Sequence, residues 1–162
     1  MKKIILSLIL LAAVAGSCNE TESTILTEEQ KQSIIAETEA VDAIISDRLI
    51  NRDAAGAFAH FSRDNFLRFI DNGHVMTDIN STVTVSTENF AHFDTVRLEF
   101  ADRQYSVLSP TLVLSTSSFT EEVVTLDGDT MNLKGAMTTL FQKRDDAWQV
   151  LHVHQSYFPI NK

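Results

Sequence analysis

Two histidines and a serine stand at alternate positions near the end of the chain, as His152, His154 and Ser156. The segment that contains them, 148–157, has apolar residues on both faces and predicts a covered β-strand. Residues two apart in a strand point to the same face of the sheet. The prediction therefore places one set of side chains on a common face: Trp148, Val150, His152, His154 and Ser156.

The two histidines have the spacing of a metal-ligand pair. Side chains at i and i+2 of a strand lie about 6.5 to 7 Å apart along the backbone, so both can reach one ion. A stable site needs a third and usually a fourth ligand. The other histidines, His60, His74 and His92, lie in other predicted elements. We therefore expect no metal ion and no cofactor.

Proton transfer is a second kind of chemistry open to this chain. A general base needs a carboxylate or imidazole in an apolar pocket, with a hydrogen-bond donor opposite it. Asp71, Asp78 and His152 have suitable side chains, and we take His152 and Asp71 as the candidate bases. Against this, Asp71 adjoins a predicted tight turn, where aspartate is most simply a turn residue. Tyr157, a candidate donor, is predicted on the face opposite His152.

The histidines also have a purely structural interpretation. They would hydrogen-bond to Ser156, to the backbone or to a helix, and close one end of a pocket. The sequence shows no Ser-His-acid arrangement for Ser156, so nucleophilic catalysis is not expected. Together with two phenylalanines, the strand residues make up the candidate pocket: Trp148, His152, His154, Ser156, Phe58 and Phe69.

The N-terminal half of the chain predicts helices and a hairpin. Thr27 and Gln30 have the spacing of a capping box, and apolar residues three and four apart predict a long helix to about residue 50. Asp53 would cap a short second helix, and the dipeptide 72–73, Asn-Gly, predicts a two-residue hairpin turn. A third helix is expected within 80–93, although a β-branched run there favours a strand.

The C-terminal half predicts four long antiparallel strands. Apolar and polar residues alternate from residue 96, and short turn sequences separate the strands. The predicted strands span 96–107, 111–126, 131–143 and 147–158. The fold class is therefore α+β, with helices first and a sheet after them.

The N-terminal segment has the composition of a signal peptide. Two lysines precede an apolar run over 4–14, which is too short to span a bilayer, since about 20 residues are needed. Small residues then precede Cys18, the only cysteine, and the segment resembles the lipobox of bacterial lipoproteins, with Ala15 where leucine is commonest. The resemblance implies acylation of Cys18. Ordinary cleavage with an unused thiol is the alternative.

These features predict a signal peptide over 1–17, a lipidated tether over 18–25 and one domain over 26–162. Loss of the leader removes two of the 13 basic residues, leaving 11 against 22 acidic ones, and moves the net charge from −9 to −11. Such a charge argues against nucleic acid as a partner. We expect a lipid-anchored protein of the bacterial cell envelope, periplasmic or surface-exposed.

Several motifs resemble a known superfamily. The end of the chain reads Thr-Leu-Phe-Gln-Lys at 139–143, a charged turn, Trp148, and His-Val-His-Gln-Ser at 152–156. Further matches are Asn-Arg-Asp at 51–53 and Phe-Ile-Asp-Asn-Gly at 69–73. This pattern is similar to the nuclear transport factor 2-like superfamily, to its SnoaL-like branch and to the association domain of calcium/calmodulin-dependent kinase.

The resemblance implies a cone-shaped fold, a cystatin-like α+β barrel in which a bent antiparallel sheet wraps the long first helix. Such domains often form homodimers through the outer face of the sheet, which would account for apolar Leu151, Val153 and Tyr157 opposite the histidines. Fold alone does not give function. We expect a membrane-anchored, small-molecule-binding or non-catalytic accessory module, whose pocket binds a small, partly apolar molecule or is vestigial. The alternatives are an isomerase- or cyclase-type enzyme and a dimeric scaffold without a ligand.

Overall fold

The computed structural model describes residues 25–63 and 68–160. The predicted signal peptide and Cys18 lie outside these residues. Nowhere in the described ranges is there a helix with the length and apolar character needed to cross a membrane. The elements follow one another as α1 Glu28–Ile50, α2 Ala54–Phe58, β1 Arg68–Asp71, β2 His74–Met76, α3 Ile79–Phe90, β3 Phe93–Ser109, β4 Leu112–Thr125, β5 Thr130–Arg144 and β6 Ala147–Pro159.

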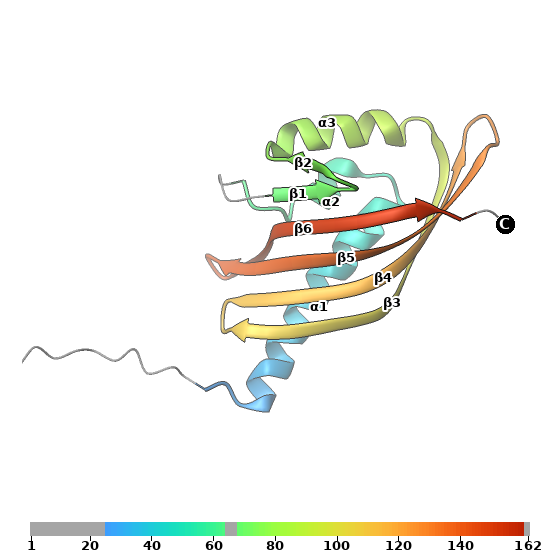
Figure 1. Cartoon of the computed structure of the whole chain (residues 1–162). Coiled ribbons are helices and arrows are strands. Elements are labelled where there is room, and N and C mark those ends of the chain that lie inside the picture. The colour runs from blue at the N-terminus through green and yellow to red at the C-terminus, as the bar shows by residue number, and fades with distance from the viewer. Residues whose placement is uncertain (1–24, 64–67, 161–162) are drawn as a thin grey trace, which may run out of the picture.

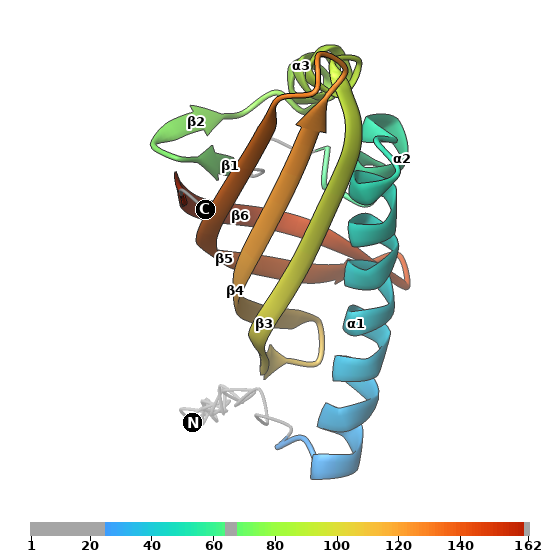
Figure 2. The same cartoon turned by 90° about the vertical axis from the view of Figure 1, so that its right-hand side faces the viewer.

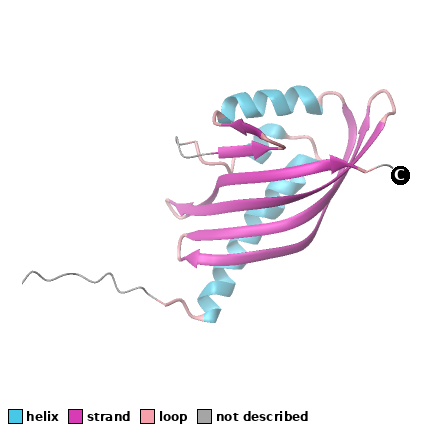
Figure 3. Ribbon diagram, in the orientation of Figure 1, coloured by secondary structure: helices cyan, strands magenta, loops and turns pink. Residues whose placement is uncertain are grey.

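One bent sheet and the helices that cover its concave face form the domain (Figures 1 and 2). The strand order is β2-β1-β6-β5-β4-β3, and α1 crosses the sheet from one end to the other. Figure 3 shows the same layers by secondary structure. The predicted α+β cone is confirmed, with one difference. The sheet is mixed. Strand β1 pairs in parallel with β6, and every other pair of neighbouring strands is antiparallel.

Two predicted local signals in the N-terminal half, the capping box and the Asn-Gly turn, form as expected. Thr27 Oγ1 accepts a hydrogen bond from the Gln30 amide at 3.2 Å, and Gln30 Oε1 accepts one from the Thr27 amide at 2.8 Å. This capping box begins α1. The hairpin between β1 and β2 turns at Asn72 and Gly73, whose φ angles of 46° and 90° both lie in the left-handed region that this turn requires.

The third helix is confirmed, but it begins earlier than predicted. Its cap is Asp78, whose carboxylate accepts hydrogen bonds from the amides of Asn80 at 3.0 Å and Ser81 at 3.3 Å. A hydrogen bond from the Ser81 hydroxyl, together with these two, holds the pKa of Asp78 below its usual value. Asp78 is therefore a helix cap, and its exposed position does not suit the catalytic base considered from the sequence.

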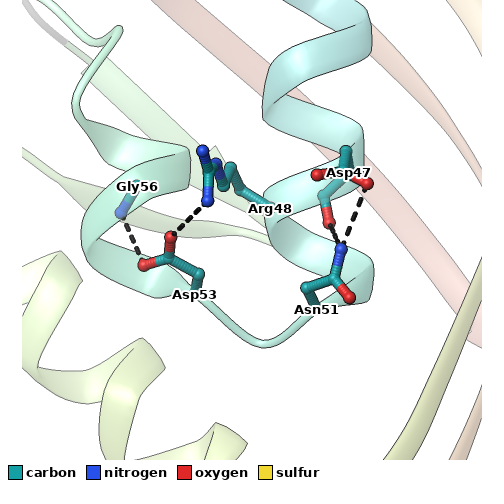
Figure 4. Close-up of polar contacts among 5 residues, drawn as sticks. All are labelled: Asp47, Arg48, Asn51, Asp53 and Gly56. Atoms are coloured by element: carbon teal, nitrogen blue, oxygen red, sulfur yellow. Dashed lines mark hydrogen bonds and ion pairs between the residues drawn. The ribbon is translucent and has the colours of Figure 1, made fainter.

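A tight corner joins α1 to α2 (Figure 4). Asp53 caps α2 by accepting a hydrogen bond from the Gly56 amide at 2.8 Å, and Arg48 Nη1 lies 3.3 Å from the same carboxylate. The α-carbon of Gly56 faces this carboxylate so closely that a β-carbon there would overlap Asp53. Glycine at this position therefore permits the cap.

The last strand contains a β-bulge that the sequence did not reveal. Phe141 pairs with Val150 and Leu140 pairs with His152, so Leu151 is an extra residue between two regular pairs. An extra residue reverses the alternation of side chains beyond it. The prediction of one common face along the strand is therefore wrong.

The bulge divides the predicted face into two. Trp148 and Val150 point into the core, whereas His152, His154 and Ser156 pair with outward-facing residues of β5 on the convex side. The buried core contains residues from every layer of the domain: Ile45, Ala54, Phe58, Phe61, Ile79, Val113, Phe141, Trp148, Val150 and Val153.

The bulge also contradicts the predicted dimer face, which consisted of Leu151, Val153 and Tyr157. Val153 is only 3% exposed and belongs to the core, and Tyr157 faces inward with it. Neither residue can contribute to the outer surface of the sheet. Leu151 occupies the bulge itself and is partly buried.

Candidate functional site

An apolar cavity of about 160 Å³ lies between the helices and the concave face of the sheet. Its wall comes from α1, α2, α3 and from strands β1 and β3 to β6, so the whole cone contributes to it. Most of the lining is apolar, and aromatic rings dominate it: Phe58, Phe61, Phe69, Phe90, Phe100, Phe119 and Phe141. Such a lining favours an apolar occupant.

Of the six predicted pocket residues, Phe58 and Phe69 line this cavity. The other four lie elsewhere. His152 is partly buried and His154 is exposed on the convex face, with Ser156 beyond them. Burial and the nearby His154 both lower the pKa of His152.

Trp148 is buried near the start of β6. Its indole Nε1 donates a hydrogen bond to Glu37 Oε2 at 2.9 Å, and Lys143 Nζ lies 2.7 Å from the same oxygen. These two donors lower the pKa of Glu37. Trp148 therefore joins β6 to α1 and has a structural role in this arrangement.

A buried polar cluster crosses from α1 to β3 at the side of the cavity. Asp42 is 4% exposed and lines the cavity. Its Oδ2 lies 3.1 Å from Arg103 Nη1 and accepts a hydrogen bond from the Tyr105 hydroxyl at 2.8 Å. Burial raises the pKa of Asp42, and the charge of Arg103 opposes that rise. Burial and Asp42 raise the pKa of Tyr105.

The sequence contained a signal for Asp42 that our prediction missed. Asp42 follows Thr38 by four residues and precedes Ile45 by three, so all three lie on one face of α1. That face is the buried one. A charged residue inside an apolar stripe requires a partner, and this requirement marks Asp42 as unusual.

A second polar group lies where β1 meets β6. Asp71 Oδ1 accepts a hydrogen bond from Gln155 Nε2 at 3.0 Å, and Asp71 Oδ2 lies 3.5 Å from the Tyr157 hydroxyl. Glu121 and Gln155 both line the cavity. We call Asp71, Glu121, Gln155 and Tyr157 the acidic group. Burial raises the pKa of Glu121, and the charge of Asp71 raises it further.

The acidic group includes one predicted base, Asp71, and one predicted donor, Tyr157. Burial and Asp71 raise the pKa of Tyr157, so its hydroxyl keeps its proton at neutral pH. Glu121 was missed, although it alternates with Phe119 and Val123 on the inner face of β4. An acidic residue at an inward-facing position, between two apolar ones, was the sequence signal that could have identified Glu121.

No metal site is apparent among residues 25–63 and 68–160. Within them, no group of three or more histidine, cysteine, aspartate or glutamate side chains is placed to hold an ion. The chemistry available at the cavity is therefore that of carboxyl, hydroxyl, amide and guanidinium groups on an apolar surface.

Comparison with known proteins agrees with this fold. The model of a family described as the SnoaL-like domain matches residues 38–161. A search of curated protein sequences gave no match.

Solved structures show the same architecture at low sequence identity. A candidate scytalone dehydratase from Novosphingobium aromaticivorans has a TM-score of 0.73 at 11% identity and covers 84% of this chain and 93% of its own. A type 2 hexachlorocyclohexane dehydrochlorinase has a TM-score of 0.69 at 7% identity, covering 83% and 94%. A nuclear transport factor 2-like superfamily protein from Salmonella enterica has a TM-score of 0.67 at 17% identity, covering 85% and 95%. At these identities the likeness concerns the fold alone.

Proposed function

The chain belongs to the SnoaL-like domain family, and we propose that its domain binds a small, largely apolar molecule in the cavity of the cone. The observation that carries this proposal is the aromatic cavity itself. A cavity of about 150 Å³ with an apolar lining stays dry in other proteins and binds benzene. The volume here, about 160 Å³, fits a ligand near the size of one substituted ring.

Binding of toluene tests this proposal. Met137 lines the cavity, so Met137→Trp should fill it, whereas Met131 is 43% exposed at the start of β5 and Met131→Trp serves as the matched control. We expect toluene to raise the melting temperature of the native protein and of the control, and to leave that of Met137→Trp unchanged. A folded native protein that does not respond to toluene would contradict ligand binding.

An acid/base enzyme is the second candidate, and the acidic group favours it. Asp71 is held by Gln155 and Tyr157 beside the cavity, while Glu121 has a raised pKa. A carboxylate base with a protonated donor nearby is the arrangement that isomerases and cyclases use. His152 is a poor base for this site because it lies on the convex face.

Turnover of enolisable ketones distinguishes the enzyme from the binding module. If the acidic group is catalytic, Asp71→Asn and Glu121→Gln should each reduce the rate of proton exchange next to the ketone by about a hundredfold or more. Both variants should still bind toluene. Exchange no faster with the native protein than in buffer would leave ligand binding as the function.

The cell-envelope location is also part of the proposal and rests on the leader sequence. Acylation of Cys18 would hold the domain at a membrane surface, since acyl chains contribute about 0.8 kcal/mol per buried methylene. Mass spectrometry of protein from its own host should find the lipid on Cys18. Cys18→Ala should move the protein from the membrane fraction to the soluble fraction.

We further propose a homodimer formed by the convex face of the sheet. Leu114 of β4 and Leu140 of β5 are direct neighbours there, next to His152 of β6, and Leu108 is 56% exposed at the end of β3. A second copy would bury this row against itself, as a twofold interface does. A dimeric scaffold without a ligand is the third candidate, but a cavity that the side chains do not close favours ligand binding.

A further inference from the structure

The wall of the aromatic cavity carries a negative charge that its own residues do not balance. Asp42 and Glu121 are the acidic side chains that line it, and none of the described residues that line it is a lysine, arginine or histidine. Arg103 lies outside the lining, 3.1 Å from Asp42, and balances that acid. Glu121 forms no ion pair within residues 25–63 and 68–160. One acid of the cavity wall therefore lacks a cation.

The backbone of β4 directs Glu121 to the concave side of the sheet. Glu121 alternates with Phe119 and Val123, which are both buried, so these three side chains share the inner face. Across the sheet, Glu121 pairs with Leu98 of β3, which lines the cavity as well. The carboxyl group therefore lies on the same side of the sheet as the cavity.

The neighbours of Glu121 do not supply a positive charge. Asp71 is a second acid; burial raises the pKa of Glu121, and the charge of Asp71 raises it further. Gln155 and Tyr157, which contact Asp71, are neutral donors. An ionised carboxylate in this environment has no countercharge, and burial of an unpaired charge is costly. Either a proton or a cationic ligand must offset that cost.

The other acid of the cavity wall shows how this domain accommodates a cation. The guanidinium of Arg103 lies between Asp42 and an aromatic ring, with its Cζ 3.9 Å from the centre of Phe100. An acid and a ring together thus hold one positive group, as the negative face of an aromatic ring favours.

Glu121 has the same surroundings without the cation. Its neighbour on the inner face is Phe119, which pairs with Phe100 across β3 and β4. The two ring centres are 6.3 Å apart, and both rings line the cavity. A carboxylate beside aromatic faces is an arrangement that recognises ammonium groups. The surroundings therefore favour a cationic ligand over a proton alone.

We propose that Glu121 binds the ammonium group of an arylalkylamine ligand whose ring occupies the aromatic cavity. This inference rests on the proposed ligand-binding function and names the class of ligand. The phenylalanines bind the ring, and Glu121 fixes the end of the molecule that carries the charge. Loss of a hydrogen bond between charged groups should weaken binding by about tenfold or more.

Three compounds that share one ring test the proposal. Benzylamine carries an ammonium group at pH 8, as lysine does, whereas benzyl alcohol and toluene are neutral. The quantity to measure by calorimetry is the ratio of the Kd of benzyl alcohol to that of benzylamine. We expect a ratio of about ten or more in the native protein. In Glu121→Gln the ratio should fall at least tenfold, with the Kd of toluene unchanged.

Glu122→Gln is the matched control. Glu122 is the next residue of β4, faces the opposite side of the sheet and lies 2.6 Å from Arg97. The same chemical change at this position should keep the native ratio. If Glu121→Gln does not fold, the comparison of benzylamine with benzyl alcohol in the native protein decides, because it needs no variant.

The failures are distinguishable. If toluene binds and benzyl alcohol binds as tightly as benzylamine, Glu121 holds a proton and this inference is overturned, while ligand binding stands. If benzylamine binds more tightly but the ratio is the same in Glu121→Gln, the ammonium group lies elsewhere and the inference is again overturned. If none of the three compounds binds the folded native protein, both the ligand-binding proposal and this inference are overturned.

Discussion

Glu121 illustrates how a single side chain acquires an unusual property, a raised pKa, in this domain. Gln155 and the Tyr157 hydroxyl contact Asp71, while Glu121 lies at the cavity wall under the influence of the Asp71 charge. Burial disfavours the charged form of a carboxyl group, and a second carboxylate disfavours it further. The consequence is a measurable dependence of stability on pH.

Glu121→Gln should stabilise the protein at high pH. The pKa of Glu121 is raised above 4.5 in the folded state, so the folded protein holds this proton more tightly than the unfolded chain does. Its contribution to stability is complete below pH 4.5 and is lost as the pH rises through the folded pKa. Urea denaturation should show the variant more stable than the native protein at pH 8 and equal to it near pH 4.

Glu122→Gln provides the control for that measurement. Glu122 faces the opposite side of β4 and pairs with Arg97 at 2.6 Å. Its replacement should give no gain in stability at pH 8. A loss of stability at pH 8 in Glu121→Gln would show that Glu121 is ionised and stabilised in the fold.

The convex-face histidines should have no influence on the cavity. We expect His152→Ala and His154→Ala to change the Kd of toluene by less than about twofold, because the sheet separates both side chains from the ligand. Phe69→Ala is the contrasting variant and should weaken toluene binding, since this ring lines the cavity. If calorimetry shows that His152→Ala or His154→Ala greatly changes the Kd of toluene, the position of the bulge is contradicted.

At the scale of elements, short irregularities determine where side chains point. The bulge at Leu151 sends His152 outward and Val153 inward, and the bulge at Asp102 turns Arg103 toward α1. The corner between α1 and α2 depends on Asp53, which caps the second helix above the cavity. Each irregularity is a local backbone feature with consequences at the site.

The variant Gly56→Ala tests the close contact between residue 56 and the Asp53 carboxylate at the corner between α1 and α2. Alanine favours a helix, but its β-carbon would overlap the Asp53 carboxylate and displace the cap. We expect a loss of about 1 kcal/mol in the free energy of unfolding, the usual value of an N-cap. In an Asp53→Ala background, the same change should instead stabilise the helix by about 0.5 to 1 kcal/mol.

This reversal of sign is the decisive outcome, because it isolates the clash between two neighbouring residues. Urea denaturation of the native protein, both single variants and the double variant supplies the four values needed. Equal effects of Gly56→Ala in both backgrounds would show that the cap tolerates a β-carbon.

For the whole molecule, the two faces of the sheet have different roles. The concave face and the helices enclose the cavity, while the convex face presents Leu114, near the start of β4, paired with Leu140 of β5. The convex face is the part that a dimer would bury.

Leu140→Lys should dissociate the proposed dimer. A lysine on each copy would place like charges within an apolar contact. Sedimentation velocity should change from a dimer to a monomer, and circular dichroism should show an intact fold. Leu126→Lys is the control, since Leu126 is 66% exposed in the turn after β4 and lies outside the convex row. A native protein that sediments as a monomer would contradict the dimer.

The sequence by itself determined the features that depend on residues close together along the chain. Thr27 and Gln30 lie three apart and form their capping box, and Asn72 with Gly73 makes the predicted turn. The four long strands and the α+β class followed from periodicity in the same way. Short-range sterics and hydrogen bonding decide such features, so local sequence is enough to predict them.

Only the tertiary structure decided which side chains meet in the site. The bulge at Leu151 depends on how β6 pairs with β5, and no signal within β6 itself reveals it. Asp42 reaches Arg103 only after α1 packs across the bent sheet. Pairing register and packing join residues far apart in the chain, and for that reason the histidines proved to lie outside the cavity while Asp42, Arg103 and Glu121 lie in or beside it.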